Sequence, residues 1–166
     1  MKIGLISDTH GVFREEWIPH LKDCDCLIHA GDMNTKACYD TIQDLGIPMY
    51  VVRGNSDMGY WADFLPEFLS VPIGGKIFYV VHDRYNLPYD LSEADFIIFG
   101  HTHCYETFAR GGKVYINPGS AGQPRWDARS LAILELPEAD KGDSASASDD
   151  AEAGQEKTYE LTRIFL

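Results

Sequence analysis

Five short apolar runs in this sequence each stop abruptly at a polar loop that contains or adjoins a glycine. Runs of this length and composition, bounded by polar loops, are typical of buried strands. The segments 14–22 and 35–45, which separate the first three runs, have helical length and mixed polarity, although Pro19 must kink or shorten the first. This alternation predicts β-α-β units of the α/β class. The five runs are residues 2–7, 26–30, 49–52, 77–81 and 96–99.

Beyond residue 55 the alternation gives way to strands joined by turns, which predicts a second sheet. Two adjacent glycines often connect the strands of a hairpin. Because 166 residues is about the length of one domain, we expect a single domain over residues 1–166. The expected strand pairs are 63–72 with 76–82 across Gly74-Gly75, 106–110 with 113–116 across Gly111-Gly112, and 131–136 with 158–165.

Acidic residues outnumber basic ones by 26 to 14, and the formal net charge is -12. This charge repels polyanions, so a nucleic-acid polymer is disfavoured as a partner. Seven acidic and two basic residues lie within 138–157, a stretch with no aromatic or β-branched residue. Burial there cannot offset the entropy lost on ordering. We therefore expect a disordered acidic hairpin loop over about 138–157.

The four cysteines are too few and too unevenly spaced for the disulfide framework of a small secreted domain. The pair Cys24 and Cys26 lacks the two-residue gap and the second pair that a zinc site usually has. No apolar stretch near residue 1 is long enough for a signal segment or a membrane span. We expect reduced thiols, a cytoplasmic protein and no membrane partner; a homo-oligomer stays open.

Side chains that can bind metal ions stand at or just after the ends of the five apolar runs. Ligands of open α/β sheets collect at the carboxyl ends of strands, so these groups should meet. In Asp8-x-His10 and His101-x-His103, residues two apart in an extended backbone point the same way. Oxygen and nitrogen ligands without cysteine suit borderline or hard divalent ions, and seven ligands are enough for two ions. The set is Asp8, His10, Asp32, Asn55, His82, His101 and His103, with Gly11, Gly31, Gly54 and Gly100 as sites for tight turns or close approach.

The motif order D-x-H, GD, GN, H and GHTH resembles that of the calcineurin-like metallophosphoesterases. Segments 52–57 and 117–120 look like the small bacterial and archaeal phosphodiesterases of the YfcE type, and the resemblance spans about residues 1–136 and the final strand. It implies an α/β fold with a two-sheet β-sandwich flanked by helices. It also implies that a hydroxide bridging two divalent ions hydrolyses a phosphodiester of a small substrate. The ions expected are Mn first, with Ni, Fe, Zn or Mg as alternatives.

The resemblance also implies roles for individual residues. Asp32, Asn55 and His101 would be catalytic, and Asn55 would contact substrate. The planar guanidinium of Arg125 suits phosphate oxygens, so we expect Arg125 to contact substrate as well, with a surface ion pair as the alternative. The alternatives are a phosphomonoesterase or nuclease with the same two-metal site, or a non-catalytic protein-interaction scaffold. A scaffold has no physical need to keep all seven coordinating side chains. The family pattern puts Asp8, His10, Asp32 and His103 on one ion, and Asp32, Asn55, His82 and His101 on the other.

Four positions depart from the family pattern or adjoin a departure. Ser56 stands where many members have a histidine that protonates the leaving oxygen, so we expect good leaving groups to react much faster. We expect Asp57 to have a structural role in the turn. Asp83 replaces a frequent glycine and should begin the next loop rather than orient His82. Tyr105 replaces a frequent proline and should line the mouth of the site.

Two further groups of residues have ordinary structural interpretations. The aromatic residues of the segment 60–68 could form an apolar wall or an oligomer contact. We expect them to pack in the core instead, and we expect His29 to be a hydrogen-bonded core histidine. The aromatics concerned are Tyr60, Trp61, Phe64 and Phe68.

The acidic segment gives a first testable prediction. Deleting about residues 139–156 and closing the turn should leave the melting temperature and any activity nearly unchanged, because loop length costs little free energy. Calorimetry and an activity assay on the shortened chain check this. A large loss of either property would mean that the acidic segment has a structural role.

Overall fold

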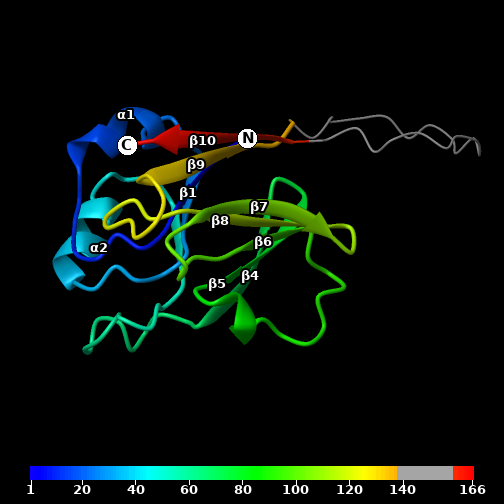
Figure 1. The fold of residues 1–166 in the computed structure, drawn as a ribbon, viewed down its shortest axis with the longest axis horizontal. Coiled ribbons are helices and arrows are strands. Elements are labelled where there is room, and N and C mark those ends of the chain that lie inside the picture. The colour runs from blue at the N-terminus through cyan, green and yellow to red at the C-terminus, as the bar shows by residue number, and fades with distance from the viewer. Residues whose placement is uncertain (138–158) are drawn as a thin grey trace, which may run out of the picture.

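Two mixed sheets of five strands each face one another in the computed structural model, which describes residues 1–137 and 159–166 (Figure 1). The first sheet has the order β10-β9-β1-β2-β3, with β1 (Lys2–Ile6), β2 (Cys26–His29), β3 (Met49–Val51), β9 (Ser130–Glu135) and β10 (Glu160–Phe165). The second has the order β4-β5-β6-β8-β7, with β4 (Phe68–Ile73), β5 (Lys76–Val81), β6 (Phe96–Ile98), β7 (Tyr105–Arg110) and β8 (Lys113–Pro118). The expected two-sheet sandwich is confirmed. The acidic loop expected at 138–157 lies outside the described residues.

The described helices are short, and they pack on the outer face of the first sheet. A 3-10 turn, η1 (Glu15–Trp17), leads into α1 (Ile18–Leu21), and Pro19 in the first turn of α1 agrees with the predicted shortening. The longer α2 (Lys36–Gln43) buries Cys38 and Ile42 in the same outer cluster as Trp17. None of the described helices is long and apolar enough to span a membrane.

The outer face of the second sheet is covered by chain without an α-helix. A second 3-10 turn, η2 (Arg84–Asn86), and the loop after it place Leu87 and Leu91 against Tyr79 and Ile97. The predicted flanking helices therefore cover one sheet, whereas a loop covers the other. This loop begins directly after His82, one of the seven expected ligands, so it also borders the site.

The main core lies between the two sheets and consists of the inward faces of their central strands. All residues of β1 except Lys2 are buried, and Ile3 and Leu5 face the second sheet. Across the core, Phe78 of β5 and Phe96 of β6 stack with their ring centroids 4.9 Å apart. All four cysteines are free, as expected.

The predicted hairpins are confirmed, with one boundary shifted by five residues and others by one or two. Gly74-Gly75 and Gly111-Gly112 have positive φ values and connect β4 to β5 and β7 to β8. Strands β9 and β10 pair antiparallel from Ser130↔Phe165 to Glu135↔Glu160. Strand β4 begins at Phe68 rather than at residue 63, because the backbone before it bonds locally: the Leu65 amide donates to Ala62, and the Arg53 amide to Pro66.

The prediction that the aromatic residues of 60–68 pack in the core is largely wrong. Tyr60 is 89% exposed and Phe64 is 88% exposed, because both lie in the loop that the local turns create. Trp61 is half-buried against Tyr39, with ring centroids 6.0 Å apart. Phe68 alone belongs to a buried cluster, where its ring meets Tyr79 edge-on.

The stacked pair at the centre of the sandwich gives a stability prediction. Phe78 is fully buried, so Phe78→Ala should leave a cavity and reduce the free energy of unfolding by about 3 to 5 kcal/mol. Urea unfolding followed by circular dichroism measures the change. Tyr89→Ala is the control, because Tyr89 is fully exposed and its removal should alter stability by less than about 0.5 kcal/mol. Equal effects of the two substitutions would contradict the assigned core.

Candidate metal centre

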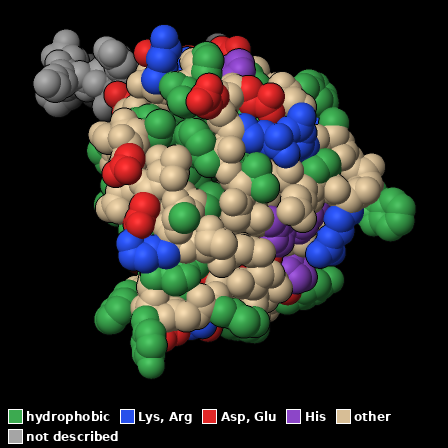
Figure 2. Space-filling view, turned by 90° about the vertical axis from the view of Figure 1, so that its left-hand side faces the viewer, with side chains coloured by type: hydrophobic (Ala, Val, Ile, Leu, Met, Phe, Trp, Pro, Cys, Tyr) green, Lys and Arg blue, Asp and Glu red, His purple; other side chains and the backbone are tan. Residues whose placement is uncertain are grey.

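The loops that follow β1, β2, β3, β5 and β6 come together at one edge of the sandwich. Backbone hydrogen bonds join them: the Asp8 amide donates to Gly31 at 3.0 Å, and the His10 amide to Asp32 at 3.0 Å. The Gly100 amide donates to His82 at 2.9 Å. Histidine side chains consequently gather on one face of the molecule (Figure 2). All seven side chains predicted as ligands lie in this region.

The backbone at five of the seven predicted ligands is left-handed rather than extended. The extended backbone predicted for Asp8-x-His10 and His101-x-His103 is therefore wrong. In an extended backbone, Asp8 and His10 would point the same way, but their φ values are +52° and +48°. Left-handed backbone is uncommon and costs about 1 kcal/mol or more at a residue other than glycine. Strain of this kind clusters at functional sites. The residues of the set in this conformation are Asp8, His10, Asp32, His101 and His103.

Two glycines allow the loops to approach the carboxylates closely. A side chain at Gly54 would collide with the backbone and carboxylate of Asp32. At Gly100 it would collide with the hydroxyl of Ser7 and the carboxylate of Asp8. The predicted need for glycine beside the site is therefore confirmed at these two positions, where any larger residue would push the loops apart.

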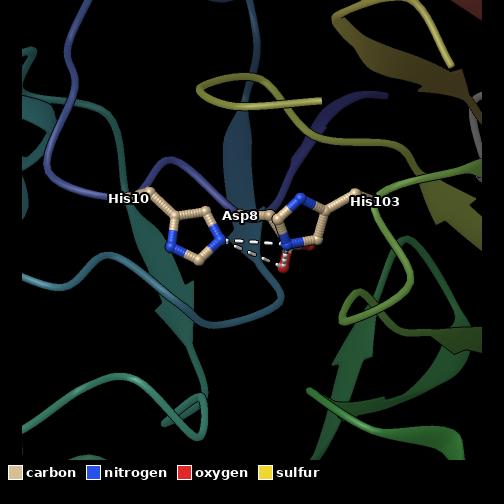
Figure 3. A group of neighbouring side chains, drawn as sticks. All are labelled: Asp8, His10 and His103. Atoms are coloured by element: carbon tan, nitrogen blue, oxygen red, sulfur yellow. Dashed lines mark hydrogen bonds and ion pairs between the residues drawn. The ribbon is translucent and has the colours of Figure 1, made fainter. Parts of the chain in front are cut away.

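Asp8, His10 and His103 form the first group of side chains (Figure 3). The Nε2 atoms of His10 and His103 point toward each other at 3.0 Å, and Nε2 of His103 lies 3.2 Å from Oδ1 of Asp8. Asp8 is fully buried, yet its Oδ1 has no hydrogen-bond partner among the described residues. A buried carboxylate oxygen without a donor is costly, and a cation at this place would satisfy it.

The second group is built around Asp32, which lies between the two sets of imidazoles. Its Oδ2 is 3.4 Å from Nε2 of His82 and 3.8 Å from Nε2 of His10. Asn55 joins the remaining rings, since its Oδ1 is 3.1 Å from Nε2 of His82 and 2.9 Å from Nδ1 of His101. In the group Asp8, Asp32 and His82, one ligand atom of each residue lies within 4.8 Å of the others.

Backbone carbonyls orient two of the imidazoles. Nδ1 of His82 donates to the Ala30 carbonyl at 2.8 Å, and Nδ1 of His103 donates to the Gln123 carbonyl at 2.7 Å. In the neutral rings the lone pair is therefore on Nε2, and it faces carboxylate or amide oxygens. Acceptors that converge in this way repel one another unless a cation lies between them. The donor set fits divalent metal ions on this ground.

The carboxylates shift the pKa values of the rings that face them. Burial acts to lower the pKa of His82, but the neighbouring Asp32 and Asp8 outweigh it and raise the pKa. The Asp8 carboxylate likewise raises the pKa of His103, against the effect of burial. Burial acts to raise the pKa of Asp32, yet the groups of His82 and Ser56 hold it well below its usual range. The site thus attracts positive charge as it stands.

Ser56 and Asp57 hold Asp32 in place through hydrogen bonds to its carboxylate and its amide. Ser56 donates to Asp32 twice, from its amide at 2.8 Å and from its hydroxyl at 3.0 Å. The buried carboxylate of Asp57 accepts from the amides of Asp32, Gly54 and Asn34 at 3.0, 2.8 and 2.7 Å. The structural role expected for Asp57 is confirmed. Its hydrogen bond from the amide of Asp32, 25 residues away in sequence, could not be predicted from the sequence.

Asp83 begins the loop after β5, as expected. Its Oδ1 accepts from the amide of Tyr85 at the start of η2, while Oδ2 lies 3.8 Å from Nε2 of His101. Asp83 therefore faces His101 rather than its chain neighbour His82.

The remaining predicted residues lie on the side of His103. Tyr105 does not line the mouth, because its ring packs against the core between the sheets and lies 4.7 Å from the guanidinium of Arg163. Arg125 is exposed and forms no hydrogen bond or ion pair with the described residues. Its charge nevertheless opposes the raised pKa of His103, so it lies near the first group.

His29 is the hydrogen-bonded core histidine that the sequence predicted. Its Nδ1 accepts from the amide of Gly31, so Nε2 carries the proton and donates to the hydroxyl of Thr9; both distances are 3.2 Å. Burial of the whole ring lowers its pKa to about 4. The neutral ring fixes the two loops that carry Asp8 and Asp32 without itself reaching the ligand cluster.

The chain matches the calcineurin-like phosphoesterase superfamily domain over residues 1–139. It therefore belongs to the calcineurin-like phosphoesterase superfamily, as the order of its motifs predicts. It is 33% identical over 180 aligned residues to the probable metallophosphoesterase YsnB of Bacillus subtilis, and the alignment covers 100% of both chains.

Solved structures share the fold. An archaeal phosphodiesterase superposes with a TM-score of 0.72 at 22% identity, over 100% of both chains. Vps29 of Entamoeba histolytica complexed with zinc superposes with a TM-score of 0.68 at 22% identity, over 99% of both chains. At this level of identity the likeness establishes the fold alone.

The buried neutral ring of His29 gives a pH prediction for the metal-free protein. The unfolded chain binds a proton at His29 near pH 6.5 and the folded chain only near pH 4, so stability is lost as the pH falls through this range. Between pH 7.5 and 5 the loss from this residue is about 2 kcal/mol. His29→Asn, which keeps an acceptor for Gly31, should lose less stability on acidification by that amount. Urea unfolding at both pH values measures it. A parent and His29→Asn with the same acid sensitivity would contradict the assignment.

Proposed function

We propose that this chain is a metal-dependent phosphodiesterase that acts on a small substrate through two divalent ions. The observation that carries the proposal is Oδ1 of buried Asp8, which accepts no hydrogen bond from the described residues and lies 3.2 Å from Nε2 of His103 and 3.9 Å from Nε2 of His10. Membership of the superfamily supports a metal-dependent phosphoesterase. Cleavage of a diester, two ions and Mn as the ion are the finer parts of the proposal.

The side chains divide between the two ions around a shared carboxylate. Asp32 would bridge, because its Oδ2 lies within 3.8 Å of both His10 and His82. When bound, two divalent ions lower the pKa of a shared water and position phosphoryl oxygens for in-line attack. Asp8, His10, Asp32 and His103 would hold one ion, and Asp32, Asn55, His82 and His101 the other.

The residues around the site determine which side chains can protonate the leaving oxygen or contact the substrate. The hydroxyl of Ser56 already donates to Asp32, so it neither replaces the histidine of other members nor supplies a proton to the leaving oxygen. Without such an acid, aryl esters should react much faster than alkyl esters, by about 10²- to 10⁴-fold. Arg125, exposed near His103, is the proposed contact for a phosphoryl oxygen, and Asn55 would contact substrate from the opposite side.

A protein-interaction scaffold is the second candidate, favoured by the shared fold with Vps29. The complete donor set speaks against a purely structural role. A scaffold gains nothing from five ligand residues in left-handed backbone or from a buried carboxylate oxygen without a partner. A phosphomonoesterase or a nuclease would use the same centre on a different substrate, and the acidic protein disfavours the nuclease.

Hydrolysis of bis(p-nitrophenyl) phosphate tests the proposal. Protein stripped of metal with a chelator should be inactive, and Mn should restore activity, with Ni, Fe, Zn and Mg compared beside it. Asp32→Asn should lower the Mn-dependent rate by about 100-fold or more, because it weakens the bridging ligand. Asp40→Asn is the matched control, since Asp40 only pairs with Lys36 on the surface. Equal rates for the parent and Asp32→Asn would rule out the proposed enzymatic function and leave the protein-interaction scaffold as the remaining candidate.

A further inference from the structure

A cleft of about 400 Å³ opens beside the second group of candidate ligands. Asn55, His82 and His101 are among its lining residues, so the cleft is continuous with the proposed metal centre. A volume of this size accommodates a small organic group. The rest of the lining comes from the loop between β3 and β4 and from the two ends of η2: Arg53, Gly54, Asp57, Met58 and Glu67, with Asp83 and Asn86.

Arg53 is the one cationic side chain among the described residues that line the cleft, and its charge is already engaged. Its Nε donates to the Asp57 carbonyl at 3.1 Å, which fixes the plane of the guanidinium. Its Nη2 lies 3.5 Å from Oδ1 of Asp63, which is outside the lining. An anion entering the cleft would therefore compete with Asp63 for this guanidinium.

The carboxylates of the cleft exceed its positive charge. Glu67 is exposed at the rim, and Asp83 is half-buried with its Oδ2 directed toward His101. With the buried Asp57, these carboxylates outnumber Arg53 by three to one, which gives the lining a formal charge of -2 with its histidines neutral and -3 when Asp63 is included. Met58 is the single large apolar side chain of the described lining, so a long hydrocarbon group would find little to cover it.

We infer that this cleft is a subsite for one alcohol arm of the phosphodiester, and that it selects an arm carrying an ammonium group over a neutral arm and rejects an anionic one. The inference rests on the proposed function, because the metal centre would hold the phosphate from which the arm extends. A small amino alcohol ester places its negative phosphate at the metal ions and its positive end at Glu67 and Asp83. The two charges of such a zwitterion thus match the two ends of the site.

Direct binding of three matched phosphate esters tests the inference on the Mn-loaded full-length protein. 2-Aminoethyl phosphate, 2-hydroxyethyl phosphate and carboxymethyl phosphate share a two-carbon arm and differ in its terminal charge. Calorimetric titration at low salt should give affinities that fall by about fivefold at each step from ammonium to hydroxyl to carboxylate. Added salt should reduce the differences in affinity between the three esters. Inorganic phosphate, titrated in parallel, reports on the metal centre alone.

Substitution of one carboxylate assigns the selectivity to this cleft. Glu67→Gln should reduce the preference for ammonium over carboxylate by about threefold or more, whereas Glu93→Gln, an exposed glutamate outside the lining, should keep the parent's preference. Equal affinities for the three esters, or an unchanged preference in Glu67→Gln, overturn the subsite while phosphate binding leaves the proposed function intact. Failure of inorganic phosphate to bind overturns both.

Discussion

Two buried carboxylates, Asp8 and Asp32, set the conditions that the rest of the structure has to meet. Neither is more than 2% exposed, and negative charge so far from water is stable only when donors or cations surround it. The amide of His101 and both donors of Ser56 meet part of that need. The left-handed loops, the glycines at 54 and 100 and the carboxylate of Asp57 bring these donors within reach. What they leave unmet at Oδ1 of Asp8 is the property that makes the cluster a candidate metal centre.

Residue type and motif order were enough to predict much of this arrangement. The five apolar runs are strands, as expected, and the loops that follow them lie at one edge of the sandwich, where five of the ligand-type residues form the two compact groups that share Asp8. Supports that depend on the backbone could not be predicted. The carbonyls of Ala30 and Gln123 orient His82 and His103, yet any residue at positions 30 and 123 could supply a carbonyl. The exposure of Tyr60 and Phe64 escaped prediction for a related reason, since local turns had removed their segment from the sheet.

The side chains that border the site differ in charge between the side of His103 and the side of His101. Near His103 the chain presents Arg125 and a loop tied down through Asp127, whose Oδ2 accepts from Arg163 at 2.6 Å and from the Tyr105 amide at 2.9 Å. Near His101 it presents the carboxylate of Asp83. In the proposed diesterase, a bound ester would lie along a gradient of potential that runs from positive to negative across the candidate metal centre. Such a gradient would fix the direction in which an asymmetric diester lies, even where contacts with its arms are few.

The left-handed backbone at the ligand residues has a consequence for how proteins of this shape could change over time. The left-handed backbone at each such ligand lowers the free energy of unfolding, and bound ions would offset this loss. Glycine or asparagine at the same position would reduce the strain. Genetic drift that erodes the ligands is therefore downhill in stability once hydrolysis is no longer under selection. Loss of catalysis with retention of the scaffold needs no new adaptive step, whereas regaining an active centre would require several unfavourable substitutions together.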